Sequence, residues 1–321
     1  MELRLVGQTD VRISRVGLGG VELGPLGGDE PNIPGAVAVI EAARASGVNW
    51  LDTSENYLDT ENESLIGAAL GRIDGEFLVA TKVAPGAAIS GGGSGFRADE
   101  VHAACRASLR RLRRDRVDLY FLHWPDDTGI PLEETWGAMA ELVDEGLVRA
   151  IGLSNYSVDD VERCHAQRRV DAIQDGLNLI DYLDNREPFA RYGKLDIAVT
   201  VYDSLSSSVL TDRTREEVLT AWETYSAHGW EHPLLASDKI DATYSVVEAL
   251  RPVANRLNAT VAQVAIAWIL CQPGVTATLA GTQSPTRARE NAGGADLDLT
   301  PEREAIEQLI PLGPAFASPA A

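Results

Sequence analysis

Short apolar runs alternate with amphipathic helical stretches along nearly the whole chain, and this alternation constrains the fold more than any other feature. Eight runs have the length and residue content of strands, namely residues 16–20, 49–53, 77–82, 118–123, 149–154, 171–174, 198–202 and 276–281. A helix-forming stretch follows each run. Strict alternation of this kind predicts an α/β fold with a parallel sheet and right-handed crossovers.

Eight such units within 321 residues fit a closed (β/α)₈ barrel, the TIM barrel. We expect a single domain over residues 1–321, with an N-terminal hairpin at 2–14 that plugs the bottom of the barrel and a flexible tail at 312–321. An open doubly wound sheet is the alternative. It is less favoured because the glycines of GLGGVELG, after the first strand, do not have the GxGxxG spacing.

Two segments interrupt the alternation. Residues 85–96 form a glycine-rich loop after the third strand, which matches no phosphate-binding P-loop. Residues 206–240 form a long polar loop after the seventh strand. Long loops in compact domains often act as lids, and this one is expected to lie at the active face.

Charge and cysteine usage exclude several classes of function. The formal net charge of −20 repels phosphate backbones and anionic membrane surfaces, so neither nucleic acid nor membrane is an expected partner. The three cysteines, Cys105, Cys164 and Cys271, have no metal-ligand or CxxC spacing. They predict free thiols in a reducing cytoplasm and no metal site. The chain has neither a signal-peptide pattern at its start nor a membrane-length apolar run.

Four side chains with catalytic chemistry fall at or just after consecutive strand ends. Asp52 ends the second strand and Tyr57 follows on its loop, whereas Lys82 ends the third strand and His123 the fourth. Active sites of α/β barrels are built at the carboxyl ends of the strands. Each residue alone is more simply explained as a cap, a surface group or a core histidine. Their occurrence together predicts a catalytic group.

The four side chains together suit proton donation. Only three of the 28 basic residues are lysines, which makes Lys82 notable, because lysine can act as a compact charge where arginine cannot. We expect its ammonium to lower the pKa of Tyr57, ordinarily about 10. Asp52 would supply the counter-charge. His123 would orient the substrate oxygen or share the proton transfer.

A general acid beside a substrate oxygen suits carbonyl reduction, which needs a hydride from a nicotinamide cofactor. Residues 280–294 follow the eighth strand, where barrels often bind phosphates. The run Ser284-Pro285-Thr286 predicts a helix start whose free N–H groups favour anions, and Arg287 and Arg289 can clamp a phosphate. An ordinary capped helix with exposed charges explains this segment alone equally well.

These motifs resemble the aldo-keto reductase family over nearly the whole chain. The segment GVNWLDTSENY is similar to the family's aspartate and tyrosine segment, ATK to its lysine strand, VDLYFLHWPD to its histidine strand, and VRAIGLSNY to its most recognisable stretch. The resemblance implies a (β/α)₈ barrel that reduces aldehydes or ketones with NADPH. It gives Tyr57 the role of proton donor, with Asp52, Lys82 and His123 as partners.

The same resemblance implies a binding residue for the substrate, Trp124, and a set of residues for the cofactor: Gly20, Ser154, Asn155, Gln174, Tyr202, Ser204, Leu205, Gly281, Gln283, Arg287, Glu290 and Asn291. Ser154, Asn155 and Gln174 would hold the nicotinamide carboxamide, and Tyr202 would stack on its ring. Arg287 would contact the 2′-phosphate and so favour NADPH over NADH. Glu290 and Asn291 would lie on the adenine side.

One departure from the family pattern concerns the loop after the seventh strand. The run YDSLSSSVLTD has Asp203, Ser204 and further serines where a small residue, proline and glycines are usual, which predicts altered cofactor affinity. Three alternatives stay open. The enzyme can reduce a keto sugar or an activated C=C bond in a biosynthetic pathway. The chain can be a cofactor-sensing subunit that binds a partner, or a barrel with non-redox chemistry.

Overall fold

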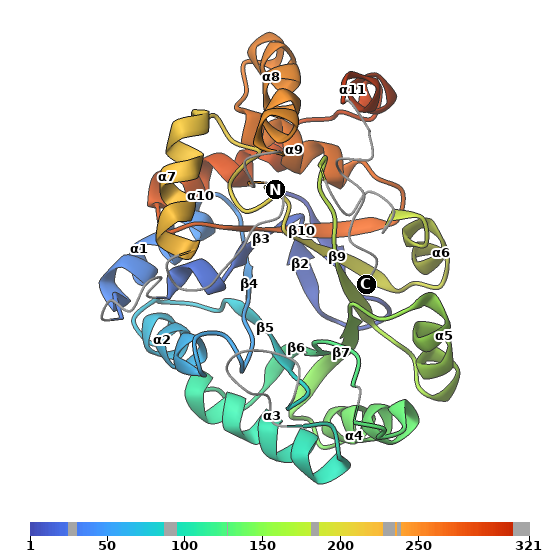
Figure 1. Cartoon of the computed structure of the whole chain (residues 1–321). Coiled ribbons are helices and arrows are strands. Elements are labelled where there is room, and N and C mark those ends of the chain that lie inside the picture. The colour runs from blue at the N-terminus through green and yellow to red at the C-terminus, as the bar shows by residue number, and fades with distance from the viewer. Residues whose placement is uncertain are drawn as a thin grey trace.

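The computed structural model describes residues 1–24, 31–86, 95–126, 128–180, 186–226, 235 and 239–310. Eight parallel strands close into a barrel in the order β10-β3-β4-β5-β6-β7-β8-β9, with helices on the outside (Figure 1). The strands are β3 (Val16–Gly19), β4 (Trp50–Asp52), β5 (Leu78–Val83), β6 (Val117–Leu122), β7 (Val148–Ser154), β8 (Ala172–Gly176), β9 (Ala198–Tyr202) and β10 (Val275–Gly281). The predicted TIM barrel is confirmed.

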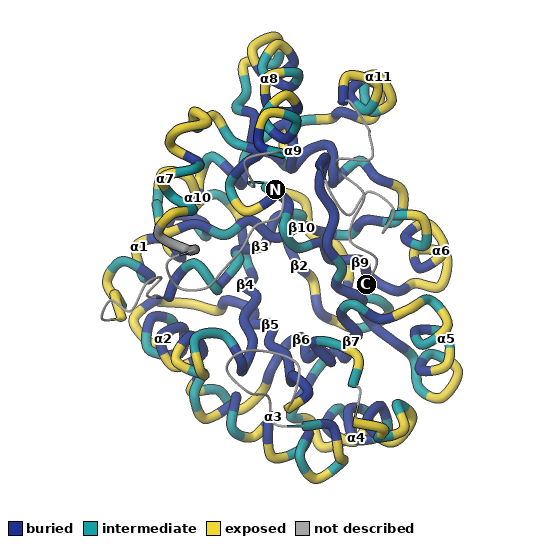
Figure 2. Tube along the Cα trace, viewed as in Figure 1, coloured by how far each residue is buried: buried dark blue, intermediate teal, exposed yellow. Residues whose placement is uncertain are grey.

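The helices surround the barrel and turn their apolar faces inward, as the buried inner and exposed outer segments of Figure 2 show. They are α1 (Ile33–Ala45), α2 (Glu61–Leu70), α3 (Ala98–Leu112), α4 (Leu132–Asp144), α5 (Val158–Gln167), α6 (Phe189–Lys194), α7 (Arg215–Ser226), α8 (Ile240–Leu257), α9 (Val261–Leu270), α10 (Pro285–Ala292) and α11 (Arg303–Leu309), with 3₁₀ turns η1 (Val21–Leu23) and η4 (Gly293–Asp296). Local sequence sets their starts. At α9, for example, Thr260 and Gln263 form a reciprocal capping box.

The N-terminal hairpin plugs one end of the barrel. Strands β1 (Leu3–Leu5) and β2 (Arg12–Ser14) pair antiparallel, as the sequence predicts. Val6, Val11 and Ile13 are fully buried and pack in one cluster with Trp50 and other residues that line the barrel. Because the plug closes the amino ends of the strands, the carboxyl ends are left for chemistry.

Barrel packing also explains a glycine that a strand would otherwise disfavour. The Trp50 ring lies against Gly17 so closely that an added Cβ would come within 2.3 Å of it. The indole N–H of Trp50 also donates to the Ser14 carbonyl oxygen at 3.0 Å, which ties the hairpin to β4. The position of β4, and of Asp52 at its end, is therefore fixed by close packing.

The described part of the chain contains no single helix long and apolar enough to cross a membrane. Helices α8 and α9 meet the length and composition criteria only as a pair, and they meet at an angle of 90°. Every residue of α9 except Gln263 is buried in the protein core.

The segment predicted as a long loop, 206–240, is not uniformly irregular. Its described part contains α7, and Trp222 of this helix packs on the core. The polar composition of the whole segment predicts a loop, and α7 is a correction to that prediction. Residues 227–234 and 236–238 of this segment, residues 87–94 of the glycine-rich loop, and the predicted tail at 312–321 lie outside the described residues.

Candidate active site

Lys82 connects the aspartate and the tyrosine at the carboxyl ends of β4 and β5. Its Nζ atom donates to Asp52 Oδ2 at 2.5 Å, to the Thr53 carbonyl oxygen at 2.8 Å and to Tyr57 Oη at 3.4 Å. The ammonium also lies 5.0 Å from the centre of the Tyr57 ring. The three side chains predicted to act together therefore do meet.

The Lys82–Asp52 pair is buried, with 1% and 5% of the two side chains exposed. Burial lowers the pKa of Lys82, and the negative charge of Asp52 opposes this shift. Asp52 is also held by Gln174, whose Nε2 donates to Oδ1 at 3.0 Å. Because removing either partner would leave an uncompensated buried charge, the two residues form one unit.

The net fall in the pKa of Tyr57 that the sequence predicts is not found in this structure. Burial raises the pKa of Tyr57 well above its ordinary value, and the carboxylates of Asp52 and Glu22 raise it further. The positive charge of Lys82 is balanced by Asp52 at 2.5 Å, closer than the phenol at 3.4 Å. Tyr57 is therefore protonated at neutral pH, the state that a proton donor needs, without the expected gain in acid strength.

His123 completes the group from the end of β6. Its ring meets the Tyr57 ring edge-on, with the centroids 5.7 Å apart, and stacks on Trp124 at 5.6 Å. Burial, and then the charge of Lys82, lower the pKa of His123 well below its ordinary value, so the imidazole is neutral at neutral pH. The indole nitrogen of Trp124 is buried and has no hydrogen-bond partner within the described residues.

Two residues that the sequence argument passed over hold His123. The Ser54 hydroxyl lies 3.0 Å from Nδ1, and the side-chain oxygen of Asn56 lies 3.1 Å from the same atom. Ser54 also donates to Asn56 Oδ1 at 2.5 Å, and both residues are buried. They lie between Asp52 and Tyr57 in the sequence, and their polarity next to a buried strand end was the available signal.

The residues expected at the nicotinamide carboxamide are joined in a chain of hydrogen bonds. Ser154 donates to the Gln174 carbonyl oxygen at 2.7 Å, and Asn155 Nδ2 donates to the Ser154 hydroxyl at 3.1 Å. Asn155 Nδ2 also donates to the His123 carbonyl oxygen at 3.0 Å, and Tyr202 donates to Asn155 Oδ1 at 2.7 Å. All of these residues come from the carboxyl ends of β6 to β9, beside the catalytic group.

The loop after β9 contains several residues with positive φ, a conformation that favours glycine, although none of them is glycine. Asp203, Ser206, Ser207 and Ser208 have φ values of 54°, 44°, 50° and 78°. Such left-handed residues cost roughly 1–2 kcal/mol each relative to right-handed ones. The carboxylate of Asp203 stabilises this conformation, because its Oδ1 atom accepts a hydrogen bond from the backbone N–H of Ser207 at 2.8 Å.

Two predicted cofactor residues lie at the start of this loop. Ser204 is buried and donates to the Leu279 carbonyl oxygen at 2.6 Å, which joins the loop to β10. Leu205 is half-buried against the main core. In this structure, the Ser204 hydroxyl therefore holds the loop to the carboxyl end of β10.

The predicted helix start after β10 is present. Ser284 caps α10 by accepting from the Arg287 backbone N–H at 3.4 Å. The Arg287 side chain is exposed and forms no ion pair with any described residue. Glu290 is half-buried and Asn291 is buried on the same helix. The arrangement can accept an anionic group at the start of α10.

Gly20 and Gly281 lie where neighbouring atoms leave no room for a side chain. A Cβ on Gly20 would come within 2.5 Å of the Asp52 carbonyl oxygen, and one on Gly281 within 1.9 Å of Glu22 Oε2. Gln283, the neighbouring predicted cofactor residue, donates from Nε2 to the Gly24 carbonyl oxygen at 3.4 Å. Glu22 was not among the predicted site residues.

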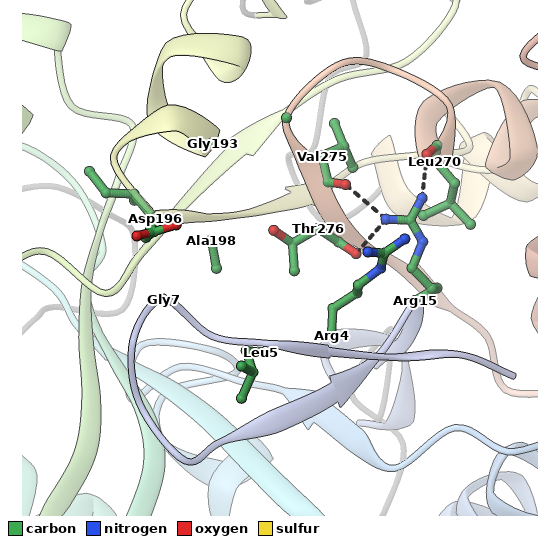
Figure 3. A pocket seen from close by; sticks show the side chains of 12 residues that line it. Arg4, Leu5, Gly7, Arg15, Gly193, Asp196, Ala198, Leu270, Val275 and Thr276 are labelled. Atoms are coloured by element: carbon green, nitrogen blue, oxygen red, sulfur yellow. Dashed lines mark hydrogen bonds between the residues drawn. The ribbon is translucent and has the colours of Figure 1, made fainter.

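A cavity of about 510 Å³ lies at the other end of the barrel, and none of the four proposed catalytic residues lines it. It is bordered by the N-terminal hairpin and the amino ends of β9 and β10 (Figure 3). Arg15 spans its edge and donates to the carbonyl oxygens of Val275 and Thr276 at 2.8 and 2.9 Å. The arginine is thus used to hold the hairpin to β10.

The family model and the relatives that match this chain point to the same family. Residues 15–309 match the model of the Aldo/keto reductase family. The chain is 30% identical to aldo-keto reductase YhdN of Bacillus subtilis (strain 168), an alignment that covers 99% of this chain and 98% of the relative. It is 28% identical to a probable voltage-gated potassium channel subunit beta of Oryza sativa subsp. japonica, over 94% of each chain.

Solved structures agree in fold. The glycerol dehydrogenase AKR11B4 from Gluconobacter oxydans superposes with a TM-score of 0.82 at 25% identity, covering 98% of each chain. The holo form of aldo-keto reductase AKR11C1 from Bacillus halodurans superposes with a TM-score of 0.78 at 23% identity, covering 98% of this chain and 97% of that one. The second likeness concerns the fold alone.

Proposed function

Since the chain belongs to the aldo/keto reductase family, we propose that it is an NADPH-dependent oxidoreductase that reduces an aldehyde or ketone to an alcohol. Tyr57 gives the proton to the substrate oxygen in this proposal. The observation that carries it is the buried contact of Lys82 with both Asp52 and Tyr57. A small-molecule carbonyl compound is the proposed substrate, and the three free cysteines accord with a cytoplasmic location.

Each member of the catalytic group has a distinct part. Tyr57 keeps its proton until the substrate oxygen gains negative charge, because its pKa is raised in the resting site. Lys82 lies 3.4 Å from the phenol oxygen and stabilises the phenolate that proton transfer creates. Asp52 holds Lys82 in place and balances its charge. Positioned acids of this kind contribute about 10²–10⁴ in rate.

His123 and Trp124 line the place of the substrate. The neutral imidazole lies edge-on to the Tyr57 ring, and its Nε2 atom can accept a hydrogen bond from a hydroxyl of the substrate or the alcohol product. The Trp124 indole N–H is a donor, and within the described residues it has no protein partner. The two side chains would therefore fix the orientation of a polar substrate group.

The residues around the site fit a nicotinamide cofactor, which supplies the hydride when it is bound. The hydrogen-bonded amides and hydroxyls of Ser154, Asn155 and Gln174 are suited to a carboxamide. Tyr202, which is bonded to Asn155, is the proposed stacking partner of the ring. Arg287, exposed at the start of α10, is the proposed partner of the 2′-phosphate and the reason for expecting NADPH.

A fluorescence titration of the cofactor-free protein with NADPH and NADH tests the proposal, followed by turnover assays on a carbonyl panel. The expected result is tight NADPH binding, with turnover that falls by about 10²–10⁴ in Tyr57→Phe. Products with an intact carbonyl and a saturated C=C bond would instead support the alternative reduction. Cofactor binding without turnover, together with a co-purifying partner, would favour a cofactor-sensing role, and the channel-subunit relative makes this outcome worth testing.

A further inference from the structure

Glu22 is a half-buried acidic residue that the proposed chemistry does not use, and its Oε2 atom is shut off from solvent. It lies on η1, between β3 and α1, and its carboxylate packs on the end of β10. A Cβ placed on Gly281 would lie 1.9 Å from Glu22 Oε2 and 2.1 Å from its carboxyl carbon. One on Gly19, at the end of β3, would lie 3.2 Å from the same oxygen. The carboxylate therefore covers two adjacent strand ends.

This carboxylate lacks the contacts that stabilise a buried negative charge. Oε2 is shut off from solvent and has no hydrogen-bond partner among the described residues. A hydrogen bond with the backbone of Glu22 itself stabilises the ionised carboxylate, whereas the nearby negative charge of Asp52 repels it. Burial is the main reason that the pKa of Glu22 is raised, and the negative charge of Asp52 raises it further. Compared with water, the site therefore favours the neutral carboxylic acid over the carboxylate.

Glu22 also lies where the proposed cofactor residues converge. Gly20 lies two residues before Glu22 in the chain, and Gly281 lies against its carboxylate. Gln283 donates to the Gly24 carbonyl oxygen at 3.4 Å. A nicotinamide dinucleotide carries a negatively charged diphosphate. An ionised Glu22 among these residues would repel that charge.

We propose that Glu22 controls cofactor affinity, because the dinucleotide binds to the form of the protein in which the Glu22 carboxyl holds a proton. When the ionised form binds cofactor, one proton from solvent is taken up at the carboxylate, and no other bond changes. This inference rests on the proposed function, since it concerns the same cofactor site. It assigns to Glu22 a role in binding, separate from proton transfer to the substrate.

The pH dependence follows from the sign of the linkage. Raising the pH through the range in which Glu22 ionises removes the binding-competent form, so the Kd for NADPH rises by up to about tenfold per pH unit. The titratable groups that face Glu22 are Asp52 on β4 and Tyr57 on the following loop, and the ends of β3 and β10 contribute glycines. Asp52 is paired with Lys82, and Tyr57 has a raised pKa, so Glu22 is the group in this cluster whose ionisation the pH series is designed to detect.

The experiment measures the Kd for NADPH by fluorescence across a pH series, for the unmodified protein, Glu22→Gln and Glu22→Ala. Glu61→Gln, at an exposed glutamate on α2, is the matched control for loss of one negative charge. We expect Glu22→Gln to bind more tightly at high pH by tenfold or more and with little pH dependence. The control should keep the slope of the unmodified protein. Calorimetry in buffers of different ionisation enthalpy should show proton uptake only where Glu22 is present.

An equal pH slope in the unmodified protein and in both Glu22 variants would overturn the inference, as would weaker binding in Glu22→Gln with normal thermal unfolding. If Glu22→Gln fails to fold, Glu22→Ala provides the same comparison, because the small side chain also removes the charge from Gly281. Absence of cofactor binding in every variant at every pH would overturn the proposed function and this inference with it. Normal binding with no Glu22 effect would overturn the inference alone.

Discussion

Lys82 and Asp52 form a salt bridge of 2.5 Å at adjacent strand ends, with both side chains almost fully removed from solvent. Such a pair contributes little net stability, because desolvation of two charges offsets their attraction. Its value lies in geometry, since it holds the ammonium beside the phenol oxygen of Tyr57. The remaining lysine hydrogen bond, to the Thr53 carbonyl oxygen, fixes the direction of the side chain.

Asp52→Asn should destabilise the protein by about 3–5 kcal/mol, because it leaves the Lys82 charge buried without a counter-charge. Urea unfolding measures this loss. Glu302→Gln is the control, because Glu302 forms an exposed pair with Arg256 that is worth about 0–1 kcal/mol. Equal losses in the two variants would show that the Lys82–Asp52 pair is not energetically distinct from a surface ion pair.

Tyr57→Phe should lower kcat by about 10²–10⁴ and leave the Kd for NADPH within twofold of its original value. The change removes one hydroxyl and keeps the ring that packs edge-on to His123. Single-turnover kinetics with bound NADPH measure the chemical step directly. Tyr156→Phe serves as a comparison, because its hydroxyl donates to the Trp124 carbonyl oxygen and is not expected to move a proton. Turnover retained in Tyr57→Phe would remove the assigned role.

Ser54 and Asn56 should fix the tautomer of His123. With Asn56 Oδ1 at 3.1 Å, an atom that only accepts, Nδ1 is expected to carry the proton. Two-bond ¹H–¹⁵N correlation spectra distinguish the two neutral tautomers. The double variant Ser54→Ala/Asn56→Leu should give a mixture of tautomers and a several-fold lower kcat. Observation of the Nε2–H form in the unmodified protein would refute the expected tautomer.

Arg287→Ala should weaken NADPH binding by tenfold or more and leave NADH binding nearly unchanged, because NADH lacks the 2′-phosphate. A charge-assisted hydrogen bond of this kind is worth about 1.5–3 kcal/mol. Fluorescence titration with both cofactors gives the ratio of the two dissociation constants. Arg110→Ala, an exposed arginine on α3, controls for the change in net charge. An equal loss of affinity for NADPH and NADH would mean that Arg287 does not bind the 2′-phosphate.

Stability should fall as the pH is lowered below about 6.5, the ordinary pKa of histidine. His123 has a depressed pKa in the folded protein, so the unfolded chain binds the proton first and the free energy of unfolding rises with pH in this window. Urea unfolding at pH 7 and pH 5.5 measures the slope. His123→Gln should reduce it, and an unchanged slope in this variant would show that His123 is not the group responsible.

The sequence predicted the barrel because each buried strand is a compact apolar run, and the register of parallel strands brings Asp52 and Lys82 together. It failed where a property depends on surroundings from other elements. The raised pKa of Tyr57 reflects burial, and the Glu22 contact depends on the approach of β10 to η1. Helix α7 was missed because it lies within a segment that is polar as a whole, although its Trp222 packs on the core.

Closure of the barrel has a consequence for how the chain can fold during synthesis. Strand β3 pairs on one side with β10, in a register that joins Val16 to Thr278. The first barrel strand therefore keeps an unpaired edge until nearly all of the chain has left the ribosome. Pairings between residues so distant in sequence form slowly, and exposed strand edges promote association between chains. We expect nascent chains that stop before residue 275 to depend on chaperones, although they already contain Asp52, Tyr57, Lys82 and His123.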